Sequence, residues 1–141
     1  MDIKKITGAN RAAWNQATPV HQRARGDDLK TEFARPGYST LDDTITALLT
    51  KLDLNGKRVA QVCCNNGRET ISLVNMGAVS AVGFDISDAA IKEAQELASI
   101  ANVDCRFVRT DAYDIGPEWN NQFDLIYISI GAISWMPNLD R

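Results

Sequence analysis

Short apolar runs alternate with stretches of helical periodicity in the second half of the chain. The runs VAQV, AVSAVGFD, CRFVR and FDLIYISIGA begin at residues 59, 78, 105 and 123 and are typical of strands buried in a sheet. Apolar residues at helical spacing fill 69–77 and 88–102 between them. Strands that alternate with helices predict an α/β fold with a parallel sheet, right-handed crossovers and helices on both faces.

Helix caps and buried stripes support this division of the chain. Ser39 is predicted to cap a helix that ends before the turn at 53–57, and Ser87 to cap the helix over 88–102. The first of these helices has its apolar face at Leu41, Ile45, Leu48, Leu49 and Leu52. The second buries Ala90, Ile91, Ala94, Leu97 and Ala98 and turns Lys92, Glu93 and Glu96 toward water.

The N-terminal segment 10–25 carries helix formers on both sides of Pro19. Asn10 and Thr18 each suit a helix start, so two short helices are expected. One interpretation is a mobile lid that lays Trp14 and His21 over a ligand. The other is a surface helix pair that Trp14 anchors to the core.

Composition places the chain among ordinary soluble globular proteins. It has 141 residues, 45% hydrophobic residues and a net charge of −3 without long runs of one sign. This charge gives no footprint for nucleic acid or an anionic membrane, and neither a membrane span nor a signal peptide is visible. The cytoplasm is the expected location. The three cysteines lack metal-ligand spacing and are expected to be reduced.

The segment after the first predicted strand has the features of a ligand-binding turn. Cys63, Cys64, Asn65, Asn66 and Gly67 separate the strand from a helix that starts near residue 68. Such a junction directs free backbone N–H groups and a positive helix end at one spot, which suits an anionic or nucleotide ligand.

Asp85 ends the second predicted strand, 18 residues after Gly67. An acid at this place lies beside the preceding loop and can bind two ribose hydroxyls. The alternative is an ordinary turn in which Asp85 caps the following helix. Asp111 and Ser129 to Gly131 follow the third and fourth strands, so four strand ends offer polar or small residues at one edge of the sheet.

Taken together, residues 55–135 resemble the class I S-adenosylmethionine-dependent methyltransferases, a family with a doubly wound Rossmann-like sheet. VAQVCCNNG matches the cofactor loop, GFDIS the ribose motif and RTDAY the adenine motif. The resemblance implies S-adenosylmethionine as cofactor and no metal. It places the following residues at the cofactor: Trp14, Cys63, Asn65, Asn66, Gly67, Asp85, Ile86, Asp111, Ala112 and Ser129. It places His21, Gly131 and Trp135 on the substrate side.

Departures from the family pattern refine this interpretation. Gln61 stands where the family usually has an acid, and Cys63 and Asn65 stand where it has glycines. Asn tolerates the left-handed backbone, so cofactor binding is expected to persist. The residues after the fourth strand differ from those of enzymes that methylate base amines. The expected partner is therefore a small-molecule substrate, with no nucleic acid and no membrane.

The resemblance also implies a division of the chain and an incomplete sheet. Residues 1–54 are expected to form a helical lid and a first packing helix, and residues 55–141 a partial cofactor-binding domain. The fourth strand would leave an apolar edge open, which predicts a fragment, a truncated product or a subunit of a dimer.

Two competing hypotheses remain at this point. One is an inactive cofactor-binding or structural remnant. The other is a nicotinamide-dependent oxidoreductase, which the missing glycines disfavour because a pyrophosphate needs close backbone approach. No general base is evident, although His21 could deprotonate a substrate hydroxyl from the lid.

Overall fold

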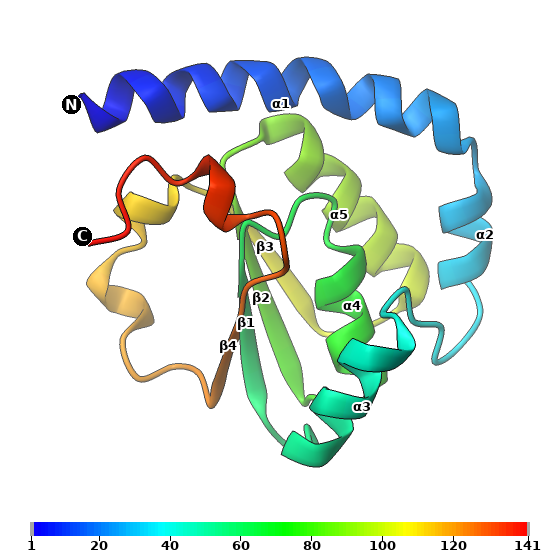
Figure 1. Ribbon diagram of the computed structural model, residues 1–141. Helices are drawn as coiled ribbons and strands as arrows, with labels where there is room; N and C mark the ends of the chain where they lie inside the picture. Colours follow the sequence, from blue (N-terminus) through cyan, green and yellow to red (C-terminus); the bar gives the residue numbers. More distant parts are fainter. Residues whose placement is uncertain (1, 141) are drawn as a thin grey trace.

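A four-stranded parallel sheet forms the centre of the protein in a computed structural model that describes residues 2–140 (Figure 1). Its strands are β1 (Arg58–Val62), β2 (Ser80–Asp85), β3 (Cys105–Arg109) and β4 (Leu125–Tyr127). Their order is β3-β2-β1-β4, and all pairings are parallel. The carboxyl ends of the strands therefore lie at one edge of the sheet, and the predicted α/β fold with a parallel sheet is confirmed.

Three helices cover one face of this sheet: α3 (Asp43–Leu52), α4 (Arg68–Asn75) and α5 (Asp88–Ala101) (Figure 1). The connection between β3 and β4 lies on the other face and contains two short 3-10 helices, η1 (Ala112–Asp114) and η2 (Pro117–Trp119). Phe84 packs there edge-on against Trp119, with ring centroids 5.0 Å apart. The expectation of helices on both faces is therefore met only in part within residues 2–140, because the second face carries short 3-10 helices and no α-helix of the β3–β4 connection.

The core consists of two apolar clusters on the helical face. One joins α4, α5 and β3 through Ile71, Leu97 and Phe107. The other joins α3, β1 and α4 through Leu49, Val59 and Leu73. Burial of these side chains holds α4 and α5 against the strands and thereby sets the position of the N-terminus of each helix.

The α5 predictions are confirmed in all but one position. Ser87 caps the helix by accepting a hydrogen bond from the Ala90 backbone at 3.1 Å, and the five predicted stripe residues are buried. Glu93, however, does not face water. It is 7% exposed and pairs with Arg25 at 2.6 Å, because α1 covers this side of α5.

Helix α3 begins later than the sequence suggested. Its N-cap is Asp42, which accepts from the Ile45 backbone at 2.8 Å, rather than Ser39. Of the predicted apolar face, Leu49 is buried, whereas Leu48 and Leu52 are each 53% exposed. This ten-residue helix buries only one side of its surface against the sheet, so Leu48 and Leu52 remain exposed to solvent.

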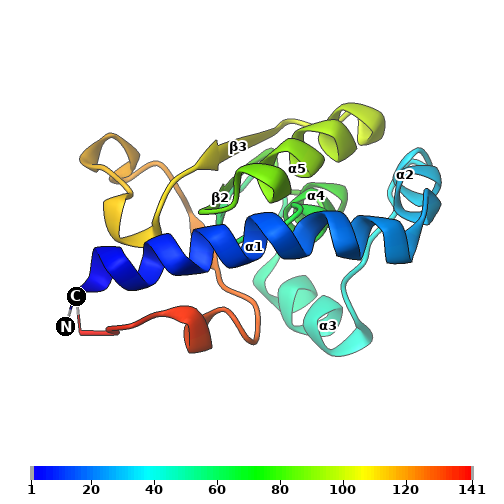
Figure 2. The same cartoon turned by 90° about the horizontal axis from the view of Figure 1, so that it is seen from above.

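The N-terminal segment is one continuous helix, α1 (Ile3–Arg25), and not two short ones (Figure 2). A short helix, α2 (Asp28–Phe33), follows it. Pro19 lies inside α1 and removes one helical N–H donor. Contacts on both sides of this proline hold the helix together, since Arg11 pairs with Asp88 and Arg25 with Glu93 on α5.

Strand β4 is shorter than its apolar run predicted. Only Leu125 to Tyr127 pair with β1, opposite Val59 to Gln61. Beyond Tyr127 the chain leaves the sheet and turns toward η3 (Ile133–Trp135), and β1 itself continues for only one further residue, to Val62. No helix within residues 2–140 is long and apolar enough to cross a membrane.

Candidate functional site

The loop between β1 and α4 takes an unusual backbone path. Cys63, Asn65 and Gly67 all have positive φ angles, of 58°, 50° and 73°. Cys63 and Asn65, which replace glycines of the family pattern, both adopt the left-handed backbone conformation. For Asn65 this conformation was predicted. Gly67 cannot be replaced in this way, because a Cβ there would come within 2.5 Å of the Phe107 ring and 2.8 Å of the Ala94 Cβ.

This path brings the loop onto Asp85 at the end of β2. The Asn65 backbone N–H donates to Oδ2 of Asp85 at 2.7 Å, and the Ser87 backbone N–H donates to Oδ1 at 2.9 Å. Burial raises the pKa of Asp85, and the backbone N–H donors oppose this rise. Ser87, not Asp85, is the helix cap, so the carboxylate is free to accept further hydrogen bonds such as those of vicinal hydroxyls.

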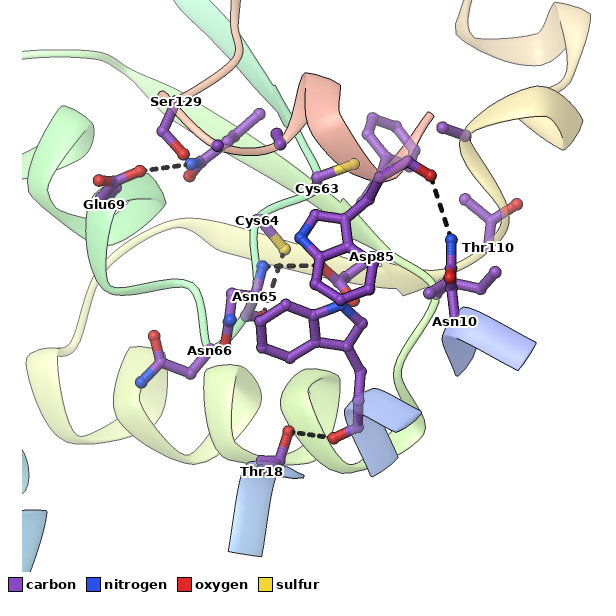
Figure 3. A pocket seen from close by; sticks show the side chains of 18 of the residues that line it. Asn10, Thr18, Cys63, Cys64, Asn65, Asn66, Glu69, Asp85, Thr110 and Ser129 are labelled. Carbon is purple, nitrogen blue, oxygen red and sulfur yellow. Dashed lines mark hydrogen bonds between the residues drawn. The ribbon is translucent and has the colours of Figure 1, made fainter. Parts of the chain in front are cut away.

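A cavity of about 640 Å³ opens above the loop and Asp85 (Figure 3). It collects residues from the carboxyl ends of all four strands and from α1. The predicted residues that line it are Trp14, His21, Cys63, Asn65, Asn66, Asp85, Ile86, Asp111, Ala112, Ser129, Gly131 and Trp135. Gly67 is the exception, because it lies below the loop against Phe107.

Asp111 stands at one end of the cavity with its carboxylate already engaged. The Lys4 ammonium lies 3.1 Å from Oδ2, and the Tyr113 backbone N–H donates to Oδ1 at 3.1 Å. Burial pushes the pKa of Asp111 upward, but hydrogen bonds from Thr7, Tyr113 and Lys4 outweigh it and leave the pKa below its usual value. This carboxylate therefore stays ionised and can accept an N–H donor.

Helix α1 lies across the cavity and contacts the C-terminal segment on its far side. Asn10 donates from Nδ2 to the Trp135 carbonyl at 3.1 Å (Figure 3). The Trp14 and Trp135 rings meet edge to face at 5.3 Å, and Trp14 lies 6.5 Å from His21. The geometry favours the lid interpretation of this segment over a surface helix that only anchors to the core.

The same helix is fastened to the start of α5. Asn15 accepts from the Ser87 hydroxyl at 2.8 Å and from the Ala89 backbone at 3.2 Å, and it donates to Asp88 at 2.9 Å. Arg11 binds Asp88 through two nitrogens at 2.8 and 2.9 Å. The pKa of Asp88 falls well below its usual range, chiefly because of Arg11 and then Asn15. The lid is thus joined to the segment that carries Asp85.

Four charged residues that line the cavity were not predicted as part of the site: Arg25, Arg68, Glu69 and Glu93. Arg25 and Glu93 form the ion pair between α1 and α5, and Oε2 of Glu93 is buried without a hydrogen-bond partner among residues 2–140. Glu69 follows the loop directly, in the first turn of α4. The position of Glu69 just after the loop was a signal that could have identified it. Glu93 gave no such signal, because its neighbours in the sequence suggest a polar, solvent-facing side of the helix.

The cysteines contribute packing rather than reactive thiolates. All three are free, and burial raises the pKa of Cys63 to about 11 and that of Cys105 to about 12. Within the described part of the chain, no group of three His, Cys, Asp or Glu side chains is placed to hold a metal ion.

The family model of a methyltransferase domain matches residues 59–141. A ribosomal protein L11 methyltransferase of Neisseria gonorrhoeae is 36% identical over 78 residues, which are 55% of this chain and 25% of the relative. A putative protein N5-glutamine methyltransferase of Methanocaldococcus jannaschii is 30% identical over 100 residues, or 71% of this chain and 49% of the relative.

A solved structure extends the likeness to the helices before β1. Magnesium protoporphyrin IX methyltransferase from Synechocystis, with bound S-adenosylhomocysteine, has a TM-score of 0.65 and 24% identity. The match covers 87% of this chain and 57% of that one. At this identity the match supports the fold alone.

These comparisons correct the predicted partner. The curated relatives are named for a ribosomal protein and for protein glutamine, so the prediction of a small-molecule substrate without nucleic acid is wrong. The chain spans between a quarter and a half of the length of these relatives. Location in the cytoplasm and a dimer stay predictions.

Proposed function

This chain belongs to the methyltransferase domain family, and on that premise we propose that it forms the cofactor-binding part of an enzyme that methylates a nitrogen of a protein. The resemblance to class I methyltransferases is confirmed by the family match, and S-adenosylmethionine is the cofactor of the family. The residues that hold it in this chain are part of the proposal.

The observation that carries the proposal is the carboxylate of Asp85 in the cavity. Its two oxygens are aligned by the N–H groups of Asn65 and Ser87, and each keeps a lone pair for a ribose hydroxyl. Asp111 follows the neighbouring strand β3 and lines the same cavity, so it is the proposed partner of the base. Hydrogen bonds from neutral hydroxyls to a carboxylate are among the stronger ones in proteins.

The proposed reaction needs few side chains. A sulfonium is already a good leaving group, so the chain must position the methyl group and exclude water rather than supply a strong base. Helix α1 with Trp14 and the segment with Trp135 cover the cavity and fit this task. We therefore also propose that residues 1–54 serve as lid and packing helix for a cofactor-binding unit at 55–141.

The surface around the cavity supports the proposal of a protein as methyl acceptor. Ile130 is fully exposed at its rim, and Trp135 and Ile133 are about half exposed. Ile130, Ile133 and Trp135 lie within six residues of one another, and a contiguous apolar patch at the rim of a cavity is a candidate surface for binding a macromolecule. The acceptor nitrogen is inferred from the name of the Methanocaldococcus jannaschii relative, which gives N5 of protein glutamine.

Two titrations test the cofactor proposal. Calorimetry with S-adenosylhomocysteine is expected to show binding at a single site, and the same titration with NAD is expected to show none. Binding of NAD alone would instead support a nicotinamide enzyme.

The acceptor is tested by methyl transfer from labelled S-adenosylmethionine. Glutamine-containing peptides are expected to become labelled, in contrast to free nucleosides. Cofactor binding without any transfer would favour the inactive cofactor-binding remnant.

A further inference from the structure

Helix α1 crosses the cavity without joining the apolar core (Figure 2). Its buried residues are two threonines, Thr7 and Thr18, and neither apolar cluster includes a residue of this helix. One face of the helix lines the cavity along most of its length, with residues three or four apart: Thr7, Asn10, Trp14, Thr18, His21 and Arg25. Hydrophobic burial therefore contributes little to holding α1 in place.

Complementary charges hold α1 against the rest of the chain. The helix carries five lysine and arginine side chains and no acidic one. Its partners are all carboxylates that follow it in the sequence, and the ion pairs are Lys4 with Asp111 and Asp114, Arg11 with Asp88, and Arg25 with Glu93. The attachment of α1 is thus mainly polar, and it depends on ionic strength wherever the pairs are open to solvent.

The ion pairs differ in their exposure to solvent. The side chains of Arg11 and Asp88 are 44% and 49% exposed, and Lys4 is more exposed still. Glu93, by contrast, is buried, and its partner Arg25 is the last residue of the helix. Because salt screens exposed charges more than buried ones, the pairs in the first half of α1 weaken first.

A pivot is present at the C-terminal end of α1. Gly26 caps the helix with φ 61° and ψ −148°, a backbone conformation that is essentially restricted to glycine. The next helix, α2, is fixed in the core through Phe33, which is 1% exposed. Arg11 lies about 22 Å from Gly26 along the helix axis. A small rotation at Gly26 therefore moves Arg11 far from Asp88 while Arg25 stays near Glu93.

The attachment of α1 is connected directly to the carboxylate of Asp85. Asn15 accepts a hydrogen bond from the Ser87 hydroxyl at 2.8 Å, and the backbone N–H of Ser87 donates to Oδ1 of Asp85 at 2.9 Å. Arg11 binds the next residue, Asp88, through two nitrogens. A ligand that orders Asp85 and Ser87 thus favours the attached position of α1, and attachment of α1 favours the ligand to the same extent.

We propose that α1 opens about Gly26 when its exposed ion pairs break, and that the pair between Arg11 and Asp88 sets the rate at which the cavity exchanges its ligand. This inference rests on the proposed function, in which that ligand is an adenosyl cofactor. Higher ionic strength then speeds ligand release while the sheet stays folded. The opened helix loses amide protection, because an isolated helix with a proline inside it is unstable in water.

The first experiment measures hydrogen exchange of α1 and α5 by mass spectrometry in about 0.1 M and about 1 M NaCl, between which the screening length falls from about 10 Å to about 3 Å. Exchange in wild-type α1 rises about threefold to tenfold with salt, whereas exchange in α5 stays constant. Arg11→Gln exchanges quickly at both salt concentrations, and Arg11→Lys, which keeps the charge, restores most of the salt dependence.

Arg23→Gln is the matched control. Arg23 is exposed on the same helix and forms no ion pair within residues 2–140, so this variant loses the same charge and behaves like wild type. Equal responses of α1 and α5 to salt would show opening of the whole chain and overturn the inference. Exchange in α1 that responds neither to salt nor to Arg11→Gln would also overturn it.

The second experiment follows release of S-adenosylhomocysteine from the same proteins by stopped-flow fluorescence, with Trp14 and Trp135 in the cavity as reporters. Arg11→Gln releases the ligand about threefold to tenfold faster than wild type in about 0.1 M NaCl, and Arg23→Gln releases it at the wild-type rate. Equal release rates for wild type and Arg11→Gln would overturn the control of ligand exchange. Failure of wild type to bind the ligand, with α1 exchange still salt-dependent, would overturn the proposed function and leave the opening of α1 standing.

Discussion

The Asn65 backbone N–H lies 2.7 Å from Oδ2 of Asp85, which ties the loop after β1 to the end of β2. Two segments that are 20 residues apart in the chain thereby form one binding surface. Asn65 makes this contact from a left-handed backbone conformation, with a φ angle of 50°. Changes in this loop should therefore affect both the fold and the site.

Gly67→Ala is expected to destabilise the chain by more than about 2 kcal/mol, because it combines a strained left-handed residue with a clash. The new Cβ would meet the Phe107 ring at 2.5 Å. Gly8→Ala is the matched control, since a Cβ there has open space within helix α1. It should stabilise by about 0.5–1 kcal/mol. Urea unfolding measures both, and equal effects would contradict this account of the loop.

Asn15→Ala is expected to lower the free energy of unfolding by about 1–2 kcal/mol, because a buried hydroxyl loses its partner. The substitution removes the bonds to Ser87, Ala89 and Asp88 that join α1 to the start of α5. Gln16→Ala, on the exposed side of the same helix, should have little effect. If both variants unfold at the same urea concentration, α1 is not held through Asn15.

The affinity for S-adenosylhomocysteine is expected to fall as the pH is lowered. The fall should begin at a higher pH than it would if Asp85 had the pKa of an ordinary aspartate. The pKa of Asp85 is raised from 3.8 by burial, so a proton competes early with the ribose hydroxyls. Asp111, whose pKa is lowered, stays ionised over the same range. Calorimetric titrations between neutral pH and pH 4 measure the effect.

This loss of affinity is not loss of fold. A carboxyl whose pKa is higher in the folded than in the unfolded state favours folding when it takes up its proton. Protonation of Asp85 should thus weaken binding while its own contribution to stability rises. A folded chain with constant affinity down to pH 4 would contradict the assignment of Asp85.

The thiols are expected to react slowly with iodoacetamide. The pKa of Cys63 is raised from 9.0 to about 11, chiefly by burial and further by Asp85, and that of Cys105 to about 12. At pH 8 the thiolate fraction of Cys63 is then lower by about 100-fold than that of an ordinary cysteine. Mass spectrometry should show rapid modification in guanidinium only. Fast labelling of the folded chain would contradict these environments.

Much of the sheet and of the lining of the cavity could be predicted from the sequence, because two of the apolar runs lead into an aspartate. Asp85 and Asp111 each follow a short apolar run, and a parallel sheet gathers such ends at one edge. Ser87 was predictable as a cap because it stands directly before the amphipathic stretch, whereas the same signal failed at Ser39 because Asp42 lies closer to the start of α3.

Features set by distant contacts could not be predicted in the same way. Pro19 reads as a break, yet ion pairs on both sides keep α1 continuous. Glu93 reads as a solvent-facing residue, and it is buried because α1 happens to cross it. The partner of Glu69 is an amide on a neighbouring strand, which local periodicity does not reveal.

The central claim is that Asp85 binds the sugar of an adenosyl cofactor, and the most direct measurement is the affinity of Asp85→Asn for S-adenosylhomocysteine. Loss of charge-assisted bonds to two hydroxyls predicts affinity lower by about 10- to 100-fold. Asp104→Asn, an exposed aspartate outside the cavity, is the control and should bind like wild type. A folded Asp85→Asn protein with wild-type affinity would contradict the account.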